Sequence, residues 1–239
     1  MDDDASMRRF AALALDELPI RLQCVGNVAQ ALAVLREGPP PALLITDMMM
    51  PGQSGLDLLQ LLADEPRLCQ GTRVVALSAG LDASTMQQLD ALGVWRQLRK
   101  PVSVAELEAC VQDALVLDRA QAAQVHPEIS DEPTVSEGER ASVAQHFGGD
   151  LALFLAYRET CLLQFAQDMA DGDQALASAD AAALRRVAHN LKSVLATIGR
   201  SDGALCARQL EDAAAAHDLE AAAGHWARLK PHIRSQNDL

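Results

Sequence analysis

Residues 43–51 read LLITDMMMP, a short apolar run that ends in an acidic residue and a turn. A run of this kind is typical of a strand buried on both faces of a parallel sheet. Similar runs occur at about 20–25, 42–46, 73–78 and 94–99, and they alternate with amphipathic helical stretches at about 5–18, 27–37, 54–64, 82–93 and 103–117. This alternation predicts an α/β domain with a doubly wound parallel sheet over residues 1–117.

The second half of the chain shows only helical periodicity. Ser136 with Glu139 predicts a capping box, Gly148 and Gly149 predict a break, and Asp150 and Asp180 are predicted N-caps of the two longest helices. Helices near 202–216 and 218–230 complete an antiparallel helical bundle over residues 134–239, and residues 171–173 are predicted to form a turn. Residues 118–133 contain two prolines and no apolar period, which predicts a linker. The fold class is therefore α/β followed by all-α.

The composition excludes several classes of partner. The chain carries 20 basic and 33 acidic residues, a formal net charge of −13, and neither half has a basic face for nucleic acid or an anionic membrane. We find no signal peptide and no apolar run long enough to span a bilayer. Five scattered cysteines without metal-ligand spacing predict buried free thiols. We therefore expect a cytoplasmic protein.

Polar residues occur where the predicted strands end. Asp47 follows the run 43–46, Ser78 follows 74–77, Lys100 precedes Pro101, and three aspartates open the chain at 2–4. The carboxyl ends of parallel strands form the edge at which open α/β sheets bind ligands. We expect these residues to meet there.

These features, in this order and spacing, resemble the receiver domain of two-component response regulators, which has a flavodoxin-like fold. The resemblance implies that Asp47 accepts a phosphoryl group, and that Lys100 and Ser78 contact it. It further implies a Mg²⁺ ion held directly by Asp3, Asp47 and the backbone carbonyl of Met49, and through water by Asp2. The first strand of that family precedes its acidic turn and is missing here. We therefore expect that the natural chain begins upstream of Met1.

His189 lies in a helix whose apolar residues form one stripe: Val187, Leu191, Val194, Leu195 and Ile198. The histidine falls almost opposite the centre of that stripe, with Lys192 and Ser193 on its own side. The helical pattern therefore predicts an exposed imidazole, which is either a solvated surface residue or a phosphoryl carrier.

The string HNLKSVLATIG at 189–199 resembles the histidine phosphotransfer (HPt) domain. This resemblance implies that His189 receives and donates a phosphoryl group and that Lys192 stabilises it.

Together the two resemblances imply a phosphorelay protein. Asp47 would take phosphate from a histidine kinase, and His189 would exchange it with a partner kinase or another receiver domain. No nucleotide-binding motif is present, so we expect no kinase activity. One alternative is a degenerate receiver that serves as a docking or dimerisation module for a working HPt domain. Another is a DNA-binding regulator, which the acidic charge of the helical half disfavours. The cognate kinase and the oligomeric state stay open.

Overall fold

A computed structural model describes residues 1–80, 83–115 and 135–234. The chain divides into two compact units, residues 1–126 and 127–239, which we describe separately. The predicted linker, 118–133, lies outside the described residues.

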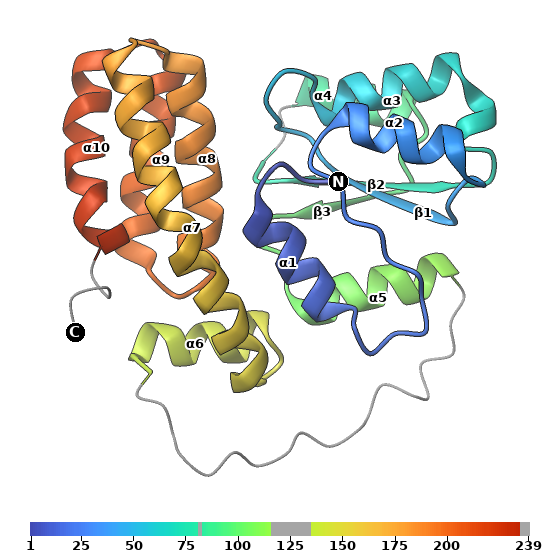
Figure 1. Ribbon diagram of the computed structural model, residues 1–239, viewed down its shortest axis with the longest axis horizontal. Helices are drawn as coiled ribbons and strands as arrows, with labels where there is room; N and C mark the ends of the chain where they lie inside the picture. The colour runs from blue at the N-terminus through green and yellow to red at the C-terminus, as the bar shows by residue number, and fades with distance from the viewer. Residues whose placement is uncertain (81–82, 116–134, 235–239) are drawn as a thin grey trace. The chain divides into compact units, whose positions relative to one another are not determined.

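The N-terminal unit contains a parallel sheet of three described strands, β1 (Leu43–Asp47), β2 (Arg73–Ser78) and β3 (Arg96–Arg99), in the order β1-β2-β3. Its helices are α1 (Ala5–Ala14), α2 (Val28–Glu37), α3 (Gly55–Asp64), α4 (Ala83–Ala91) and α5 (Val104–Leu115), with a short 3₁₀ turn, η1, at Pro66–Leu68. Figure 1 shows α1 and α5 on one face of the sheet and α2 and α3 on the other. The predicted α/β fold with helices on both faces is confirmed.

The predicted strand at 20–25 is wrong, because these residues are in no strand of the structure. Only their last residue is tied toward the sheet: the amide of Asp2 donates to the carbonyl of Val25 at 3.2 Å. The residue before Asp2 contacts β1 instead. The Met1 amino group donates to the Ile45 carbonyl at 2.6 Å, and the Asp47 amide donates to the Met1 carbonyl at 2.9 Å. A strand is defined by a paired neighbour, and here Asp2 alone pairs with the segment, at its last residue.

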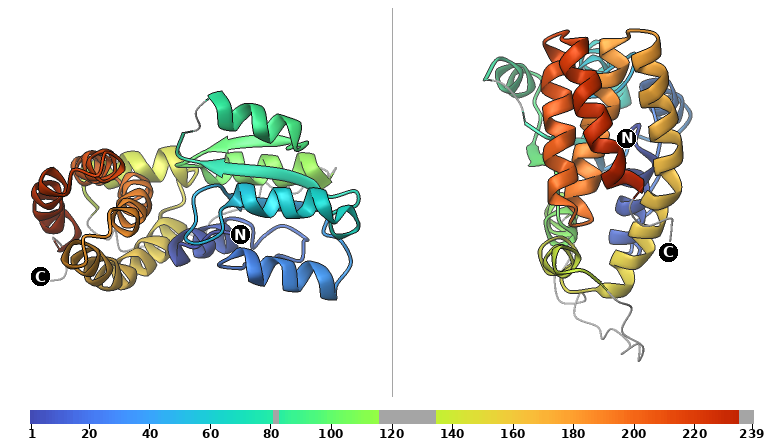
Figure 2. Two further views of the ribbon diagram at one scale, coloured as in Figure 1. Left: turned by 90° about the horizontal axis from the view of Figure 1, so that it is seen from above. Right: turned by 90° about the vertical axis from the view of Figure 1, so that its left-hand side faces the viewer.

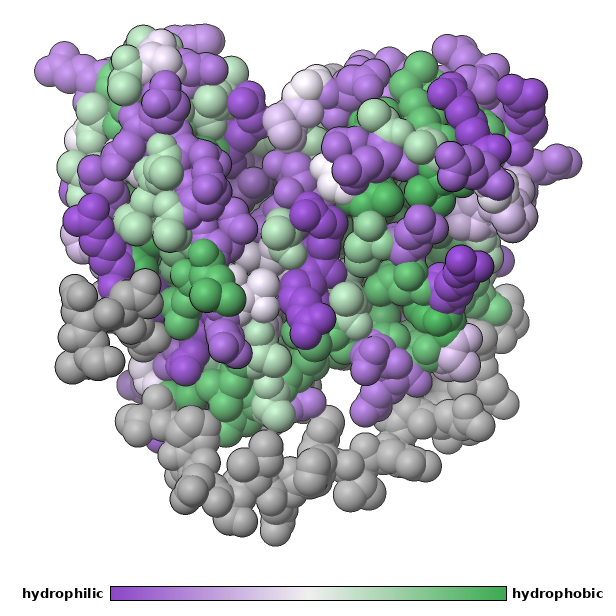
Figure 3. Space-filling view, viewed as in Figure 1, coloured by the Kyte–Doolittle hydropathy of each residue, from purple (hydrophilic) through white to green (hydrophobic). Residues whose placement is uncertain are grey.

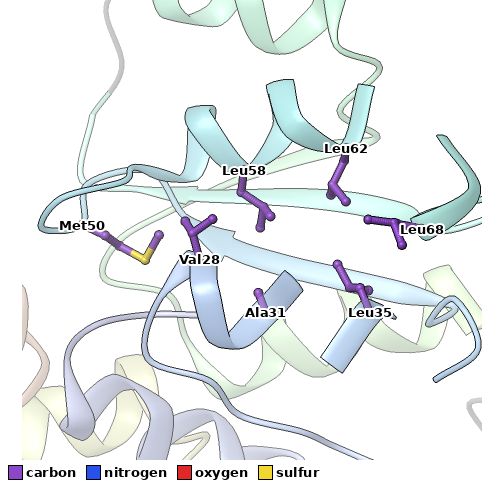
Figure 4. Close-up of a cluster of buried hydrophobic side chains, with 7 residues drawn as sticks. All are labelled: Val28, Ala31, Leu35, Met50, Leu58, Leu62 and Leu68. Carbon is purple, nitrogen blue, oxygen red and sulfur yellow. The ribbon is translucent and has the colours of Figure 1, made fainter. Parts of the chain in front are cut away.

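The core of this unit on one face of the sheet lies between α2 and α3. Side chains from the two helices pack against each other there, and Met50 and Leu68 lie at the two ends of the cluster (Figure 4). The buried members of this cluster are Val28, Ala31, Leu35, Met50, Leu58, Leu62 and Leu68. The loop after β1 thus carries a core residue, so apolar packing fixes the segment that follows Asp47.

The C-terminal unit consists of α6 (Glu137–His146), α7 (Leu151–Ala177), α8 (Ala181–Thr197), α9 (Ser201–Ala215) and α10 (Leu219–Arg234). Helix α7 contacts α8, α8 contacts α9, α9 contacts α10, and α10 returns to α7, which gives the predicted antiparallel bundle (Figure 2). The capping box at Ser136 and the N-caps at Asp150 and Asp180 are confirmed. Gly148 and Gly149 both have positive φ.

The predicted turn at residues 171–173 is wrong, because these residues lie inside α7. The glycine has a packing role: a Cβ atom at Gly172 would come within 2.3 Å of the Trp226 ring. The Trp226 indole also donates to Asp173 at 2.7 Å. The glycine thus lets the largest side chain of the bundle lie against the backbone of α7.

The surface of the bundle is mixed in character. Figure 3 shows hydrophilic side chains interspersed with apolar ones over the drawn face of the helical unit. Among the described helices, none is long and apolar enough to cross a membrane. All five cysteines are free, and Cys110, Cys161 and Cys206 are buried as expected. Cys69 is only half-buried and Cys24 is exposed, so the expectation is wrong for these two.

Candidate functional site

One candidate site lies where the described strands end. Asp47 is the last residue of β1 and is fully buried, at 0 % exposure. The ammonium group of Lys100 lies between two carboxylates, donating to Oδ2 of Asp47 and to Oδ2 of Asp2, each at 2.8 Å. The structure therefore brings together three residues that are far apart in the sequence.

The charge of Lys100 is set by these neighbours. Burial by itself lowers the pKa of a lysine, because it removes the charged form from water. The carboxylates of Asp2 and Asp47 outweigh that effect and hold the pKa of Lys100 above its ordinary value. The site thus holds a permanent positive charge against Asp47.

Carboxylate oxygens gather at the same place. One oxygen from each of Asp2, Asp3 and Asp47 lies within 4.8 Å of the other two. A hard divalent cation such as Mg²⁺ prefers carboxylate and other oxygen ligands, so this donor set fits the ion. The amide of Met49 donates to Oδ1 of Asp47 at 3.1 Å, which places the backbone of this predicted ligand beside the site.

The segments around Asp47 are held by close backbone contacts. Ser78 ends β2, and its carbonyl accepts from the Lys100 amide at 2.7 Å, so these two predicted residues are neighbours across strand ends. At Gly55, a Cβ atom would come within 2.1 Å of the Asp47 carbonyl oxygen. Only glycine allows the start of α3 to approach the end of β1 this closely.

The second candidate site surrounds His189 on α8, and the predicted exposure of this residue is wrong. The residue is 4 % exposed, and its Nδ1 atom lies 2.7 Å from Oε1 of Glu211 on α9. Lys192 donates to the other carboxylate oxygen of Glu211. A helical pattern shows which side chains avoid the apolar stripe, but it does not show which of them a neighbouring helix meets with a charged partner.

The charges determine which ring nitrogen carries the proton. Burial alone raises the pKa of Glu211, but hydrogen bonds from His189 and Lys192 lower it to about 2. Glu211 is therefore ionised near neutral pH and can only accept hydrogen bonds. The hydrogen bond then requires a proton on Nδ1, which leaves the lone pair of a neutral ring on Nε2. Among the described residues, Nε2 has no hydrogen-bond partner.

Glu211 is the functional candidate that sequence reasoning missed. A signal for it exists, because Ala207, Leu210, Glu211 and Ala214 form one buried stripe of α9. A carboxylate on such a stripe needs a cationic or hydrogen-bonding partner. Ser193, which shares His189's side of α8, is also buried, and its hydroxyl lies 3.4 Å from the His189 carbonyl.

Comparison with protein families identifies both units. Residues 1–112 match the model of the response regulator receiver domain, and residues 156–235 match the model of the Hpt domain. The chain is 27% identical over 161 residues to the DNA-binding transcriptional regulator NtrC of Azospirillum brasilense, covering 64% of this chain and 32% of that protein. It is 30% identical over 119 residues to the sensory/regulatory protein RpfC of Xanthomonas campestris pv. campestris, covering 49% of this chain and 16% of that protein.

A third relative is the DNA-binding response regulator MtrA of Mycobacterium tuberculosis. It is 30% identical over 115 residues, which cover 48% of this chain and 48% of that protein. The chain thus spans half or less of the length of these relatives. Among solved structures, chemotaxis protein CheY4 of Vibrio cholerae aligns with a TM-score of 0.44 at 20% identity, over 47% of this chain and 92% of that one. The chain belongs to the two-component signalling families, joining a response regulator receiver domain to an Hpt domain.

Proposed function

We propose that this chain is a phosphorelay protein that accepts a phosphoryl group on Asp47 and exchanges phosphate through His189. One observation carries the proposal: each acceptor side chain is held beside a charged side chain that suits its chemistry. Asp47 lies against the ammonium of Lys100, and the imidazole of His189 lies against the carboxylate of Glu211. A receiver that is only a docking module is not favoured, because both halves match phosphotransfer families.

At the first acceptor, a carboxylate oxygen of Asp47 forms a bond to phosphorus while the bond from phosphorus to the donor nitrogen breaks. Mg²⁺, when bound by Asp2, Asp3, Asp47 and the Met49 carbonyl, neutralises negative charge on the phosphoryl oxygens. Lys100 is already protonated and buried, so it pairs with a phosphoryl oxygen without having to gain a proton. We assign to the Ser78 hydroxyl, at the adjoining strand end, a hydrogen bond to another phosphoryl oxygen.

At the second acceptor, the lone pair of His189 Nε2 forms the bond to phosphorus while the bond from phosphorus to an aspartate oxygen of the phosphorylated partner receiver breaks, which releases that carboxylate. The ring becomes positively charged as this bond forms, and the carboxylate of Glu211 stabilises that charge through Nδ1–H. In the reverse step an aspartate oxygen of the partner receiver bonds to phosphorus, the nitrogen–phosphorus bond breaks, and its electron pair returns to Nε2. Lys192, three residues along α8, supplies a positive charge for the phosphoryl oxygens.

The proposed partners are a histidine kinase and a second receiver domain, with no nucleic acid and no membrane. In this proposal the chain accepts and donates phosphoryl groups and does not itself use ATP. We place it in the cytoplasm, where ATP-dependent kinases act.

Two chemically distinct phosphoryl linkages provide the test. We incubate the full chain with Mg²⁺ and labelled acetyl phosphate, or with a panel of purified phosphorylated kinases, and measure label after acid and after base treatment. Asp47→Asn should abolish the acid-stable, base-labile acyl phosphate, and His189→Gln should abolish the acid-labile, base-stable phosphoramidate. If both kinds of label persist in both variants, the assignments are wrong. Asp113→Asn, at a half-exposed helix position, is the matched control for loss of an acidic residue.

A further inference from the structure

The backbone of the acidic turn is held by one arginine side chain. Arg8 lies in α1, and its Nη1 donates to the carbonyl oxygens of both Asp2 and Asp3, at 2.7 and 2.8 Å. Asp2 and Asp3 also supply two of the three clustered carboxylates. A single nitrogen of Arg8 therefore bridges the two consecutive peptide units that carry these carboxylates.

Other contacts of the turn act on different atoms. The Asp4 amide donates to Oδ1 of Asp2 at 3.0 Å, and the side chain of Asp4 caps α1 by accepting from the Ser6 amide at 2.7 Å. Oδ2 of Asp2 accepts from Lys100. These bonds hold the carboxylate of Asp2 and the start of the helix, whereas the bonds from Arg8 hold the main-chain carbonyls of the turn.

We propose that Arg8 is a positioning residue that fixes the acidic turn for Mg²⁺ and disfavours larger divalent cations. This inference rests on the proposed Mg²⁺ site. Mg²⁺ demands near-octahedral oxygen ligands at about 2.0–2.1 Å, whereas Ca²⁺ accepts about 2.3–2.6 Å and variable geometry. A turn fixed at two successive carbonyls holds its carboxylates in one arrangement, which benefits the ion with the stricter geometry.

The charge of Arg8 has a separate and opposite effect. A guanidinium near three carboxylates repels any divalent cation, so removing it raises the affinity for Mg²⁺ and Ca²⁺ alike. Loss of positioning lowers the affinity for Mg²⁺ more than that for Ca²⁺. The ratio of the two affinities therefore isolates positioning from charge.

The test uses Arg8→Met in the full chain, with Arg9→Met as the matched control. Arg9 is the next residue of the same helix and is exposed, so its loss removes the same charge nearby without removing the bonds to the turn. Isothermal titration with MgCl₂ and with CaCl₂ gives both dissociation constants. We expect the preference for Mg²⁺ over Ca²⁺ to fall about tenfold in Arg8→Met, the lower end of effects seen for residues that orient metal ligands, and to stay unchanged in Arg9→Met.

An unchanged ratio in folded Arg8→Met, or an equal fall in Arg9→Met, overturns the inference. If Arg8→Met does not fold, Arg8→Gln replaces it, because this shorter side chain is unable to bridge both carbonyls. Failure of the site itself looks different: the parent chain then shows no Mg²⁺ binding, or Asp47→Asn binds Mg²⁺ as the parent does. Either of those outcomes overturns both proposals.

Discussion

Replacing Glu211 with glutamine tests the charge assignment around His189. Glutamine keeps the size of the side chain and a carbonyl oxygen that accepts the hydrogen bond from Nδ1, but it carries no charge and does not titrate. The variant therefore removes the linkage between pH and stability at this position. It retains most of the packing between α8 and α9.

The expected magnitude follows from the pKa of Glu211. The hydrogen bonds to His189 and Lys192 lower this pKa from 4.5 to about 2 in the folded protein. A depressed acid pKa stabilises the fold above the unfolded value and loses that contribution as pH falls through the folded value. At about 1.4 kcal/mol per pKa unit, the full contribution is about 3 kcal/mol above pH 4.5, of which about 2 kcal/mol is lost by pH 3.

Urea unfolding at pH 5 and at pH 3 measures this loss. The chain has two tryptophans, so Trp95→Phe leaves Trp226, buried in the bundle, as the fluorescent reporter of the C-terminal unit. Between the two pH values, the parent should lose about 2 kcal/mol more unfolding free energy than Glu211→Gln in the same background. Other acidic groups titrate in both proteins and cancel in the difference.

Equal losses in the two proteins would refute the reasoning. They would mean that Glu211 is not ionised against His189 and Lys192 in the folded state. The proton would then not be confined to Nδ1, and the argument that Nε2 is the nucleophile would lose its basis.

Three further outcomes follow from the packing and the site. Gly172→Ala should lower the unfolding free energy by about 2 kcal/mol, because the new Cβ atom meets the Trp226 ring. Gly224→Ala should raise it by about 1 kcal/mol, because a Cβ atom there meets open space beside its own helix; urea titration checks both. His189→Ala should lower the unfolding free energy by about 2 kcal/mol in the same urea titration. Loss of an exposed histidine would lower it by under about 0.5 kcal/mol. Saturating Mg²⁺, at about 100 times its dissociation constant, should stabilise the N-terminal unit by about 2.7 kcal/mol in thermal unfolding, and Asp47→Asn should abolish that gain.

The sequence predicted most elements because their signals are local. The strands at 43–47 and 73–78 and the capped helices at 137–146, 151–177 and 181–197 carry their own periodicity and end signals. The segment 20–25 has the composition of a strand, but a strand also needs a paired neighbour, and only Asp2 reaches it. Residues 171–173 have the composition of a turn, but tertiary packing of Trp226 overrides it.

The candidate site was predictable where topology alone brings residues together. Parallel strands end at one edge, so the meeting of Asp47 with Lys100 follows once the strands are placed. Which residue of α9 faces His189 depends on the packing angle and rotation of two helices, and no local pattern on α8 contains that information. The exposure of His189 was therefore predicted wrongly, and Glu211 was missed.

The two proposed acceptors have fixed partners of opposite charge, and this bears on how phosphate would move both ways between an aspartate and a histidine. At Asp47, the nucleophile is an anion and its fixed partner, Lys100, is a cation; the positive charge stays to meet the incoming phosphoryl oxygens. At His189, a neutral ring would become cationic when Nε2 bonds to phosphorus, and its fixed partner is the anion Glu211. Lys192 balances that carboxylate, so the phosphoryl group does not face an uncompensated negative charge. A fixed charge thus offsets the charge that transfer brings to each site: the negative phosphoryl oxygens at Asp47 and the positive ring at His189.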